Sequence, residues 1–235
     1  MRWALLLVVL AGAAQAQSVE VTSDGAVARF EGPTDRYGHA IMGNLPEWSR
    51  LCLSHGTDEA CVTLAETSVF EDMAPRLADM DGDGLDDAVV VESSVSGGAS
   101  LVVYRREGSR LVRTATPPIG RRNRWLSPIG IADFDADGRM DVAYVETPHL
   151  GKLIKIFSWD EGALTLIARA SKFSNHRIGE ETISSGVRDC GDGLEMVVPS
   201  GDWTRIYGLR FQDGQLRAKE LSSYSAGALK ELLAC

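Results

Sequence analysis

The chain has 235 residues, a formal net charge of −9 and 44% hydrophobic residues. Such an acidic chain is a poor candidate for nucleic-acid binding, because the phosphate backbone repels it. The length permits one or two domains, and no segment rich in proline, glycine or serine divides the chain. We therefore predict one domain over residues 17–235 and no nucleic-acid partner. Composition does not decide between a monomer and a homo-oligomer.

Residues 1–16 have the pattern of a secretory signal peptide. Arg2 precedes an uncharged, mostly apolar stretch, and residues 14–16 form an Ala-x-Ala cleavage site. The stretch is short for a membrane span, although a retained anchor is the alternative. We predict cleavage before Gln17, a periplasmic or secreted protein, and no membrane span.

The next segments indicate short β-strands. Residues 19–22 and 26–30 are separated by a Ser-Asp-Gly turn, which predicts a β-hairpin. A first repeat, without an acidic loop, is predicted over residues 36–70, with elements at 38–43, 50–53 and 61–64. Trp48 and Trp159, like the aromatic residues within the predicted strands, are expected in the core.

An acidic nine-residue loop at residues 79–87 recurs at residues 133–141. Carboxylates at loop positions 1, 3, 5 and 9, with a backbone carbonyl at position 7, can converge on one calcium ion, and the glycine at position 6 allows the sharp turn. An acidic surface turn without metal is the alternative. We predict two structural Ca²⁺ sites, with the ligands Asp79, Asp81, Asp83, Leu85 and Asp87 in the first, and Asp133, Asp135, Asp137, Arg139 and Asp141 in the second.

These loops differ from an EF-hand. An EF-hand needs a bidentate Glu at position 12 and a helix on each side, whereas position 12 is Val90 in the first loop and Tyr144 in the second. The residues after each loop are apolar and rich in β-branched side chains, which favours strands. Each loop is therefore expected to join two strands.

The similarity between the two repeats extends beyond the loops. Residues 77–79 match 131–133, residues 91–93 match 145–147, and two later apolar runs also correspond. Four short strands in about 50 residues match one blade of a β-propeller. We predict repeats over 71–120 and 121–175.

A third repeat is predicted over residues 176–225. Residues 186–198 keep the frame but lose carboxylates, so no good calcium site is expected at 189–195. Residues 226–234 favour a short C-terminal helix. The predicted fold is therefore an all-β propeller of four or five blades, with four antiparallel strands in each. The hairpin at 19–30 could pair with the last blade and close the ring.

Export favours disulfides. The four cysteines allow three pairings. We favour Cys52–Cys61, which closes a short hairpin-like loop, and Cys190–Cys235, which ties the last residue to the final repeat. A zinc site is the alternative, although no C-x-x-C pair occurs.

The acidic loops and their flanking strands resemble FG-GAP/VCBS repeats, the calcium-loop blades of integrin α-subunit-like propellers, over roughly residues 70–200. The flanks depart from the family pattern: Ile129-Gly130 stands where Phe-Gly is usual, and Glu92 or Glu146 falls near the usual Gly-Ala-Pro. Integrin-like propellers have seven blades, more than this chain can form. Closure within one chain therefore stays open.

Strand direction predicts a ligand face. Because neighbouring strands are antiparallel, segments that precede Leu77 and Ile131 or follow Val91 and Val145 should lie at the end opposite the acidic loops. Solvated loop residues, with both tryptophans packed between blades, are the alternative. The candidates are His39, Glu71, Asp72, Glu92, Arg124, Trp125, Glu146, His149, His176, Arg177, Glu180 and Trp203.

These features favour an exported, calcium-stabilised binding module that recognises a protein, peptide or glycan on this face. A hydrolase that uses His39, His149 and His176 with nearby carboxylates is the alternative, and a structural or assembly protein is a third reading. No Gly-x-Ser-x-Gly, His-Glu-x-x-His or P-loop motif is present, so no catalytic residue is assigned.

Overall fold

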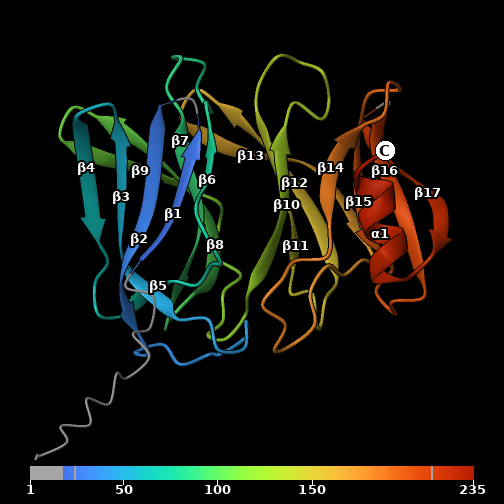
Figure 1. Cartoon of the computed structure of the whole chain (residues 1–235), viewed down its shortest axis with the longest axis horizontal. Helices are drawn as coiled ribbons and strands as arrows, with labels where there is room; N and C mark the ends of the chain where they lie inside the picture. Colours follow the sequence, from blue (N-terminus) through green and yellow to red (C-terminus); the bar gives the residue numbers. More distant parts are fainter. Residues whose placement is uncertain (1–17, 24, 213) are drawn as a thin grey trace, which may run out of the picture.

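The computed structural model describes residues 18–23, 25–212 and 214–235. The predicted signal peptide lies outside these residues. The described chain is all-β, with antiparallel strands and one short helix near the C-terminus (Figure 1). No described helix is long and apolar enough to cross a membrane.

The N-terminal strands form one antiparallel group. Its members are β1 (Ser18–Ser23), β2 (Ala26–Thr34), β3 (Glu47–His55) and β4 (Asp58–Thr63). The predicted hairpin is present as β1 and β2, with Gly25 at a φ of 86° in the turn.

Two predictions for this region are wrong. The hairpin pairs with β3 and not with the last sheet, because Ala28 and Phe30 pack on the same core as Leu51. Residues 38–46 form turns instead of a strand, and positive φ angles at Ala40 and at the glycines of this segment are incompatible with a strand.

The first acidic repeat continues the same sheet. Strand β5 (Ser68–Phe70) joins β3 to β7, so that nine strands share one hydrogen-bonded network. The repeat itself consists of β6 (Arg76–Ala78), β7 (Asp87–Ser94), β8 (Gly98–Glu107) and β9 (Arg110–Ala115).

Two separate four-stranded antiparallel sheets follow. The first contains β10 (Leu126–Ala132), β11 (Asp141–Glu146), β12 (Leu153–Asp160) and β13 (Ala163–Ser171). The second contains β14 (Gly186–Asp189), β15 (Leu194–Pro199), β16 (Arg205–Gln212) and β17 (Gln215–Ser223). As predicted, each acidic loop joins the first two strands of its unit.

The core lies between neighbouring sheets. One cluster joins Val89 and Leu101 of the first repeat to Val142 and Tyr144 of the next, and a second joins Ile156 to Met196. Trp48 and Trp159 are buried, as predicted. The strands bury apolar side chains on both faces, which stabilises the fold by about 25 cal/mol per Å² of apolar surface. Because the strands are held in this way, the loops that connect them have fixed positions at each end.

The C-terminal helix α1 (Ala226–Leu233) packs on the last sheet. Ser225 caps its first turn by accepting a hydrogen bond from the backbone N–H of Ala228. Leu229 is buried, and a side chain at Gly186 on β14 would collide with Leu233. The predicted helix is therefore present and covers one face of β14.

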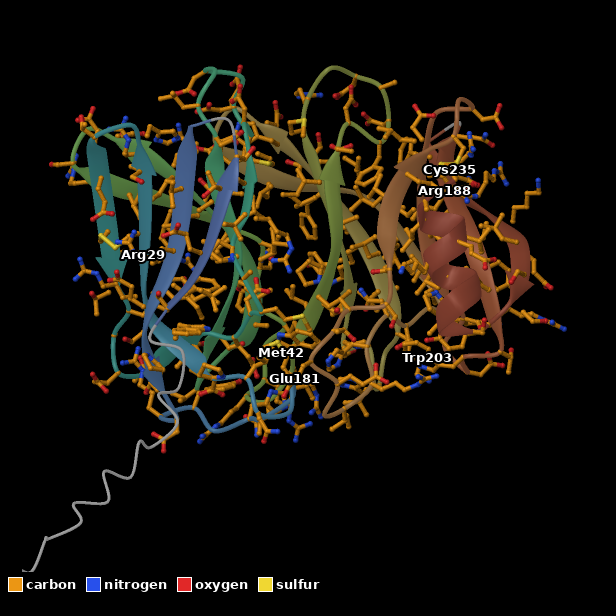
Figure 2. All side chains as sticks on the ribbon, viewed as in Figure 1. Arg29, Met42, Glu181, Arg188, Trp203 and Cys235 are labelled. Carbon is orange, nitrogen blue, oxygen red and sulfur yellow. A yellow bond between two sulfur atoms is a disulfide. The ribbon has the colours of Figure 1, made fainter. Side chains whose placement is uncertain are left out.

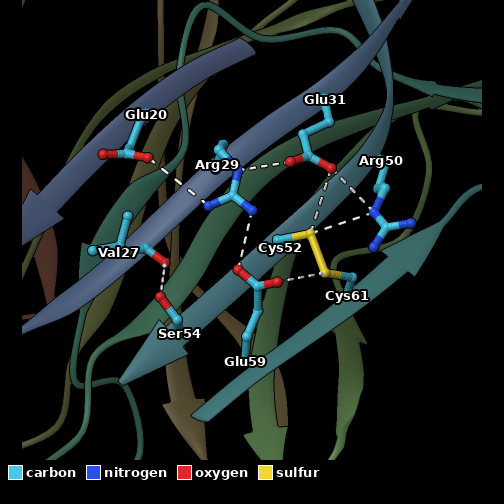
Figure 3. A network of polar contacts seen from close by, with 9 residues as sticks. All are labelled: Glu20, Val27, Arg29, Glu31, Arg50, Cys52, Ser54, Glu59 and Cys61. Atoms are coloured by element: carbon cyan, nitrogen blue, oxygen red, sulfur yellow. Dashed lines mark hydrogen bonds and ion pairs between the residues drawn. A yellow bond between two sulfur atoms is a disulfide. The ribbon is translucent and has the colours of Figure 1, made fainter. Parts of the chain in front are cut away.

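Both predicted disulfides are present. Cys52–Cys61 joins directly opposite positions of β3 and β4, and Cys190–Cys235 joins the third loop to the residue after α1. Figure 3 shows the first bond beside a network in which Arg29 contacts the carboxylates of Glu31 and Glu59. The pairs are partly exposed, so they contribute little to the free energy of unfolding.

The two ends of the strands carry different loops. The acidic loops lie at the upper end in Figure 1, and the segment between β2 and β3 crosses the lower end. Met42, Glu181 and Trp203 lie in the lower part of Figure 2. The sheets thus separate an acidic end from an end formed by the remaining connections.

Candidate functional site

The two acidic loops fold in the same way. Asp79 accepts hydrogen bonds from the backbone N–H groups of Asp83 (3.1 Å) and Gly84 (2.9 Å). Asp133 accepts the corresponding bonds from Asp137 (3.1 Å) and Gly138 (2.9 Å). Gly84 and Gly138 have φ angles of 88° and 87°, which explains the glycine at position 6.

Carboxylate oxygens converge in both loops. One oxygen from each of Asp79, Asp81 and Asp83, at loop positions 1, 3 and 5, lies within 4.8 Å of the other two. In the second loop the corresponding group is Asp133, Asp135 and Asp141, at positions 1, 3 and 9. Oδ1 of Asp141 and Oγ of Ser158, opposite it on β12, are buried, and neither makes a hydrogen bond of good geometry among the described residues, although Ser158 is close enough to lower the pKa of Asp141. An unpaired carboxylate oxygen beside two other carboxylates fits a hard cation.

Burial also affects the last carboxylate of each loop. Removal from water, with a further contribution from Asp81, raises the pKa of Asp87 to about 8. Burial raises the pKa of Asp141 to about 6, and Asp135 adds to this effect. The loops therefore gather carboxylates in surroundings that disfavour their charge unless a cation is present.

A cavity of about 580 Å³ lies between the two acidic loops. Arg105 enters it, donates to Asp81 (2.7 Å) and lies 5.4 Å from the ring centre of Trp159. The guanidinium neutralises part of the first loop, whereas Arg139 does so in the second through Asp137 (2.7 Å).

The third loop uses protein cations instead. Glu195 is the second residue of β15, one position after the place that Asp87 and Asp141 take at the starts of β7 and β11. Its carboxylate is held by Arg188 (2.5 Å) and Arg210 (3.1 Å). Two guanidinium groups thus balance the charge of Glu195, and the expectation that this loop is a poor calcium site stays a prediction.

A second cavity, of about 220 Å³, lies at the opposite end. Four segments from different parts of the chain meet there, and the candidates His39, Arg124, Trp125 and His149 all line it. The segment between β2 and β3 closes one side of this cavity. There the backbone carbonyl of Ile41 accepts a hydrogen bond from Gly179 N–H (3.0 Å). We call this space, lined by His39, Ile41, Asn123, Arg124, Trp125, Thr147, His149, Leu150 and Ile178, the four-loop cavity.

A buried carboxylate orients one histidine of the four-loop cavity. Glu71, 1% exposed, contacts Nδ1 of His39 at 2.6 Å and accepts a hydrogen bond from Ser93 Oγ at 2.5 Å. Burial raises the pKa of Glu71, and the hydrogen bonds from His39 and Ser93 oppose that rise. Trp125 Nε1 donates to the backbone carbonyl of Glu71 (2.8 Å), which fixes the indole behind the same segment.

A second histidine pair stands on the other side. Nε2 of His176 contacts the Glu180 carbonyl at 2.8 Å, and its Nδ1 contacts Nε2 of His149 at 3.0 Å. Because a carbonyl only accepts, a neutral His176 carries its proton on Nε2 and accepts from His149. His149 therefore presents an unprotonated Nδ1.

The other candidates have structural partners elsewhere. Asp72 binds Arg76, Glu92 binds Arg113 and Tyr104, and Glu146 binds Lys155. Arg177 stacks 3.9 Å from the centre of the Trp203 ring and contacts Glu180. These residues position loops near the four-loop cavity but do not line it.

Sequence reasoning missed the apolar residues of the four-loop cavity. Ile178 is 70% exposed and Leu150 is 63% exposed. Both stand inside otherwise polar connecting segments, and that contrast was the available signal. Thr147 has a φ of 45°, an uncommon value for a β-branched residue, and its backbone accepts hydrogen bonds that shape the turn.

These features define an all-β protein of antiparallel four-stranded sheets with acidic turns between first and second strands. Residues 79–144 match the family model of the FG-GAP-like repeat, from the first acidic loop into β11. The chain therefore carries an FG-GAP-like repeat, and the resemblance is confirmed over that range. No curated protein matches the chain.

Replacement of Asp72 is expected to destabilise the fold. Asp72 is 0% exposed; it binds Arg76 through both oxygens (2.8 and 3.1 Å) and accepts from Val91 N–H (2.9 Å). Asp72→Ala should lower the free energy of unfolding by about 2–3 kcal/mol, because a buried N–H and a guanidinium lose their acceptor. Urea unfolding measures the loss.

The matched control is Glu66→Ala. Glu66 also pairs with an arginine, Arg36 (3.4 Å), but its side chain is 90% exposed. Its removal should change the free energy of unfolding by less than about 0.5 kcal/mol. Equal losses in the two variants would contradict the structural role of Asp72.

The histidine pair predicts a loss of stability in mild acid. Burial lowers the pKa of His149 to about 4, with a smaller contribution from His176, whose own pKa is also lowered by burial. Unfolded histidine titrates near pH 6.5, so between about pH 6.5 and 4 the unfolded chain binds protons that the folded chain does not. Stability should therefore fall as the pH falls through this window.

The contribution of His149 to this loss of stability is measured by comparing the wild type with a His149→Gln variant. Wild type should lose about 1–2 kcal/mol more than the variant between about pH 6.5 and 4.5, after allowance for solvent screening. Parallel profiles for wild type and His149→Gln would contradict the prediction.

Proposed function

We propose that the protein is an exported β-propeller-type binding module, stabilised by calcium, that recognises a protein, peptide or glycan at the end opposite its acidic loops. The FG-GAP-like repeat and the runs of four antiparallel strands support the propeller assignment. We assign four blades, formed by β1–β4, β6–β9, β10–β13 and β14–β17. The two disulfides fit an oxidising compartment outside the cytoplasm.

Calcium would be held by the carboxylates of the two acidic loops, with the backbone carbonyls of Leu85 and Arg139 at position 7. The ion would supply positive charge that offsets repulsion among the carboxylates. The converging oxygens and the unpaired Oδ1 of Asp141 support this assignment. The loops themselves supply backbone N–H groups that orient Asp79 and Asp133.

The observation that carries the binding function is the four-loop cavity. Segments that are remote in sequence build it on a rigid set of strands, and such loops are common binding positions. Two exposed apolar side chains, Leu150 and Ile178, stand at its edge. A partner that covered both side chains would remove their apolar surface from water.

The binding function is tested with the protein immobilised through its C-terminal end and probed with arrays of extracellular proteins and oligosaccharides. A specific ligand of the wild type should be lost by an Ile178→Ser variant. Leu166→Ser is the matched control, because Leu166 is also exposed (41%) but lies on β13 away from the cavity. Retention of every ligand by Ile178→Ser would argue against this face.

A hydrolase remains the second candidate function, because His39 and His149 line one cavity and His39 is bonded to a carboxylate. When Glu71 accepts from Nδ1, Nε2 of His39 is free to accept a proton from water, as a general base requires. A panel of nitrophenyl esters, phosphates and glycosides tests this role. Turnover that is lost in His39→Gln and kept in His55→Gln would support it; no turnover by the wild type would end it.

A further inference from the structure

The four-loop cavity fits one side chain of a partner. Its volume of about 220 Å³ is below the range of about 300–1,000 Å³ that is usual for whole small-molecule ligands. Ile41, Leu150 and Ile178 provide apolar walls, and Trp125, 2% exposed, closes the floor. An apolar side chain inserted there would replace water against these walls.

The two exposed apolar residues are held in place by their neighbours. Two residues before Ile178, His176 is fully buried, and Arg177 stacks on the Trp203 ring. Directly after Ile178, the N–H of Gly179 donates to the backbone carbonyl of Ile41. Leu150 lies in a turn in which its own N–H donates to the Thr147 carbonyl (2.8 Å). Both residues therefore form a fixed rim, which lowers the entropic cost of binding.

The same rim is positively charged, although the chain has a net charge of −9. Arg124 lines the cavity, and Arg121 and Arg122 precede it on the same turn. Among the described residues, none of these three guanidinium groups forms an ion pair with a carboxylate, and no acidic side chain lines the cavity. Glu71 lies behind the wall, where it is bound to His39 and Ser93.

Further contacts fix the turn that carries these arginines. Arg122 donates to the Tyr37 carbonyl (3.0 Å), and Asn123 N–H donates to the Tyr37 hydroxyl (2.8 Å). Arg124 has a side-chain hydrogen bond only to the neighbouring Asn123 carbonyl (3.2 Å) among the described residues. The turn is thus anchored through Arg122 and Asn123, while Arg124 keeps donors for a ligand carboxylate.

We propose that the four-loop cavity binds an acidic peptide segment of a partner protein, with one apolar side chain inserted in the cavity and adjacent carboxylates bound by Arg124 and the arginines beside it. This inference rests on the proposed binding function and names its ligand class. A peptide fits better than a glycan, because the cavity offers apolar walls and no exposed aromatic face for a sugar ring. Arginine binds carboxylates with paired donors, which gives specificity as well as attraction.

The test uses fluorescence anisotropy with labelled peptides and the full chain in calcium. The probe peptides carry a central leucine, isoleucine, phenylalanine or tryptophan flanked on each side by two glutamates. At least one should bind saturably, and a central alanine or lysine flanks should weaken binding at least roughly tenfold. Binding should also weaken as salt is raised, because the charged rim is exposed.

Two protein variants locate the binding. Arg124→Glu and Ile178→Ser should each weaken the best peptide at least roughly tenfold. Their controls are Arg217→Glu, an exposed arginine on β17 with the same charge change, and Leu166→Ser. Circular dichroism of each variant confirms that it is folded before its binding is compared.

The outcomes separate this inference from the proposed function. No saturable binding by any glutamate-flanked peptide below about 1 mM, equal binding of lysine-flanked peptides, or unchanged binding by Arg124→Glu would each overturn the acidic-peptide assignment. If an oligosaccharide binds instead and Ile178→Ser removes it, the ligand class is wrong and the binding module stands. If Ile178→Ser changes the binding of no array ligand and of no peptide, both proposals fail.

Discussion

Chelation with EDTA is expected to lower the thermal unfolding midpoint by about 10–20 °C relative to a calcium-saturated sample. Each site occupied at about one hundred times its Kd stabilises the fold by about 2.7 kcal/mol, and a chain of this size shifts by about 2–4 °C per kcal/mol. The physical reason is the convergence of carboxylates in both loops, including the unpaired oxygen of Asp141. Differential scanning fluorimetry with added calcium measures the recovery.

Paired substitutions make this test sharper. Asp79→Asn with Asp133→Asn should lower stability in calcium, because both ions lose a ligand. In EDTA the same double variant should differ less from wild type than in calcium, because removal of like-charge repulsion offsets part of the lost hydrogen bonds to the loop N–H groups. Asp189→Asn is the control, because the third loop is balanced by Arg188 and Arg210. An unchanged melting curve with and without calcium would contradict the metal assignment.

Loss of the Cys190–Cys235 bond is expected to cost about 4 kcal/mol of unfolding free energy, because the bond closes a loop with a sequence separation of 45. The change is Cys190→Ser with Cys235→Ser, measured by urea unfolding. Helix α1 has eight residues, too few to be stable alone, so its amide protons should exchange faster before the sheets are affected.

The matched control is Cys52→Ser with Cys61→Ser. That bond has a sequence separation of 9 and joins residues already paired across β3 and β4. Its loss should cost about 2.5 kcal/mol on the same entropic model and should leave α1 protected. Equal protection of α1 in both variants would contradict the anchoring role of Cys235.

The acidic loops were predictable because their information is local. Glycine at position 6 takes a positive φ angle in both copies, and the aspartates bond to N–H groups only a few residues away. The β-branched runs after each loop likewise form β7 and β11. These features depend on nearest neighbours, so the pattern of residues was sufficient.

The four-loop cavity was only partly predictable. Strand direction placed His39, Arg124, Trp125 and His149 at one end, and the structure brings them around one space. The same reasoning included Asp72 and Glu92, which instead form ion pairs with arginines. Direction along a strand fixes the end of a sheet at which a residue lies, but not whether its side chain points outward or inward.

The sequence by itself determined the repeat period, the acidic turns, the all-β class and the C-terminal helix, and it favoured the two disulfides that the structure contains. Tertiary structure decided the partner of the N-terminal hairpin and the contact of Ile41 with Gly179, which closes the four-loop cavity. The division has one physical reason. Turns, strands and caps are set by interactions over a few residues, whereas the packing of segments more than one hundred residues apart depends on how whole sheets fit against each other.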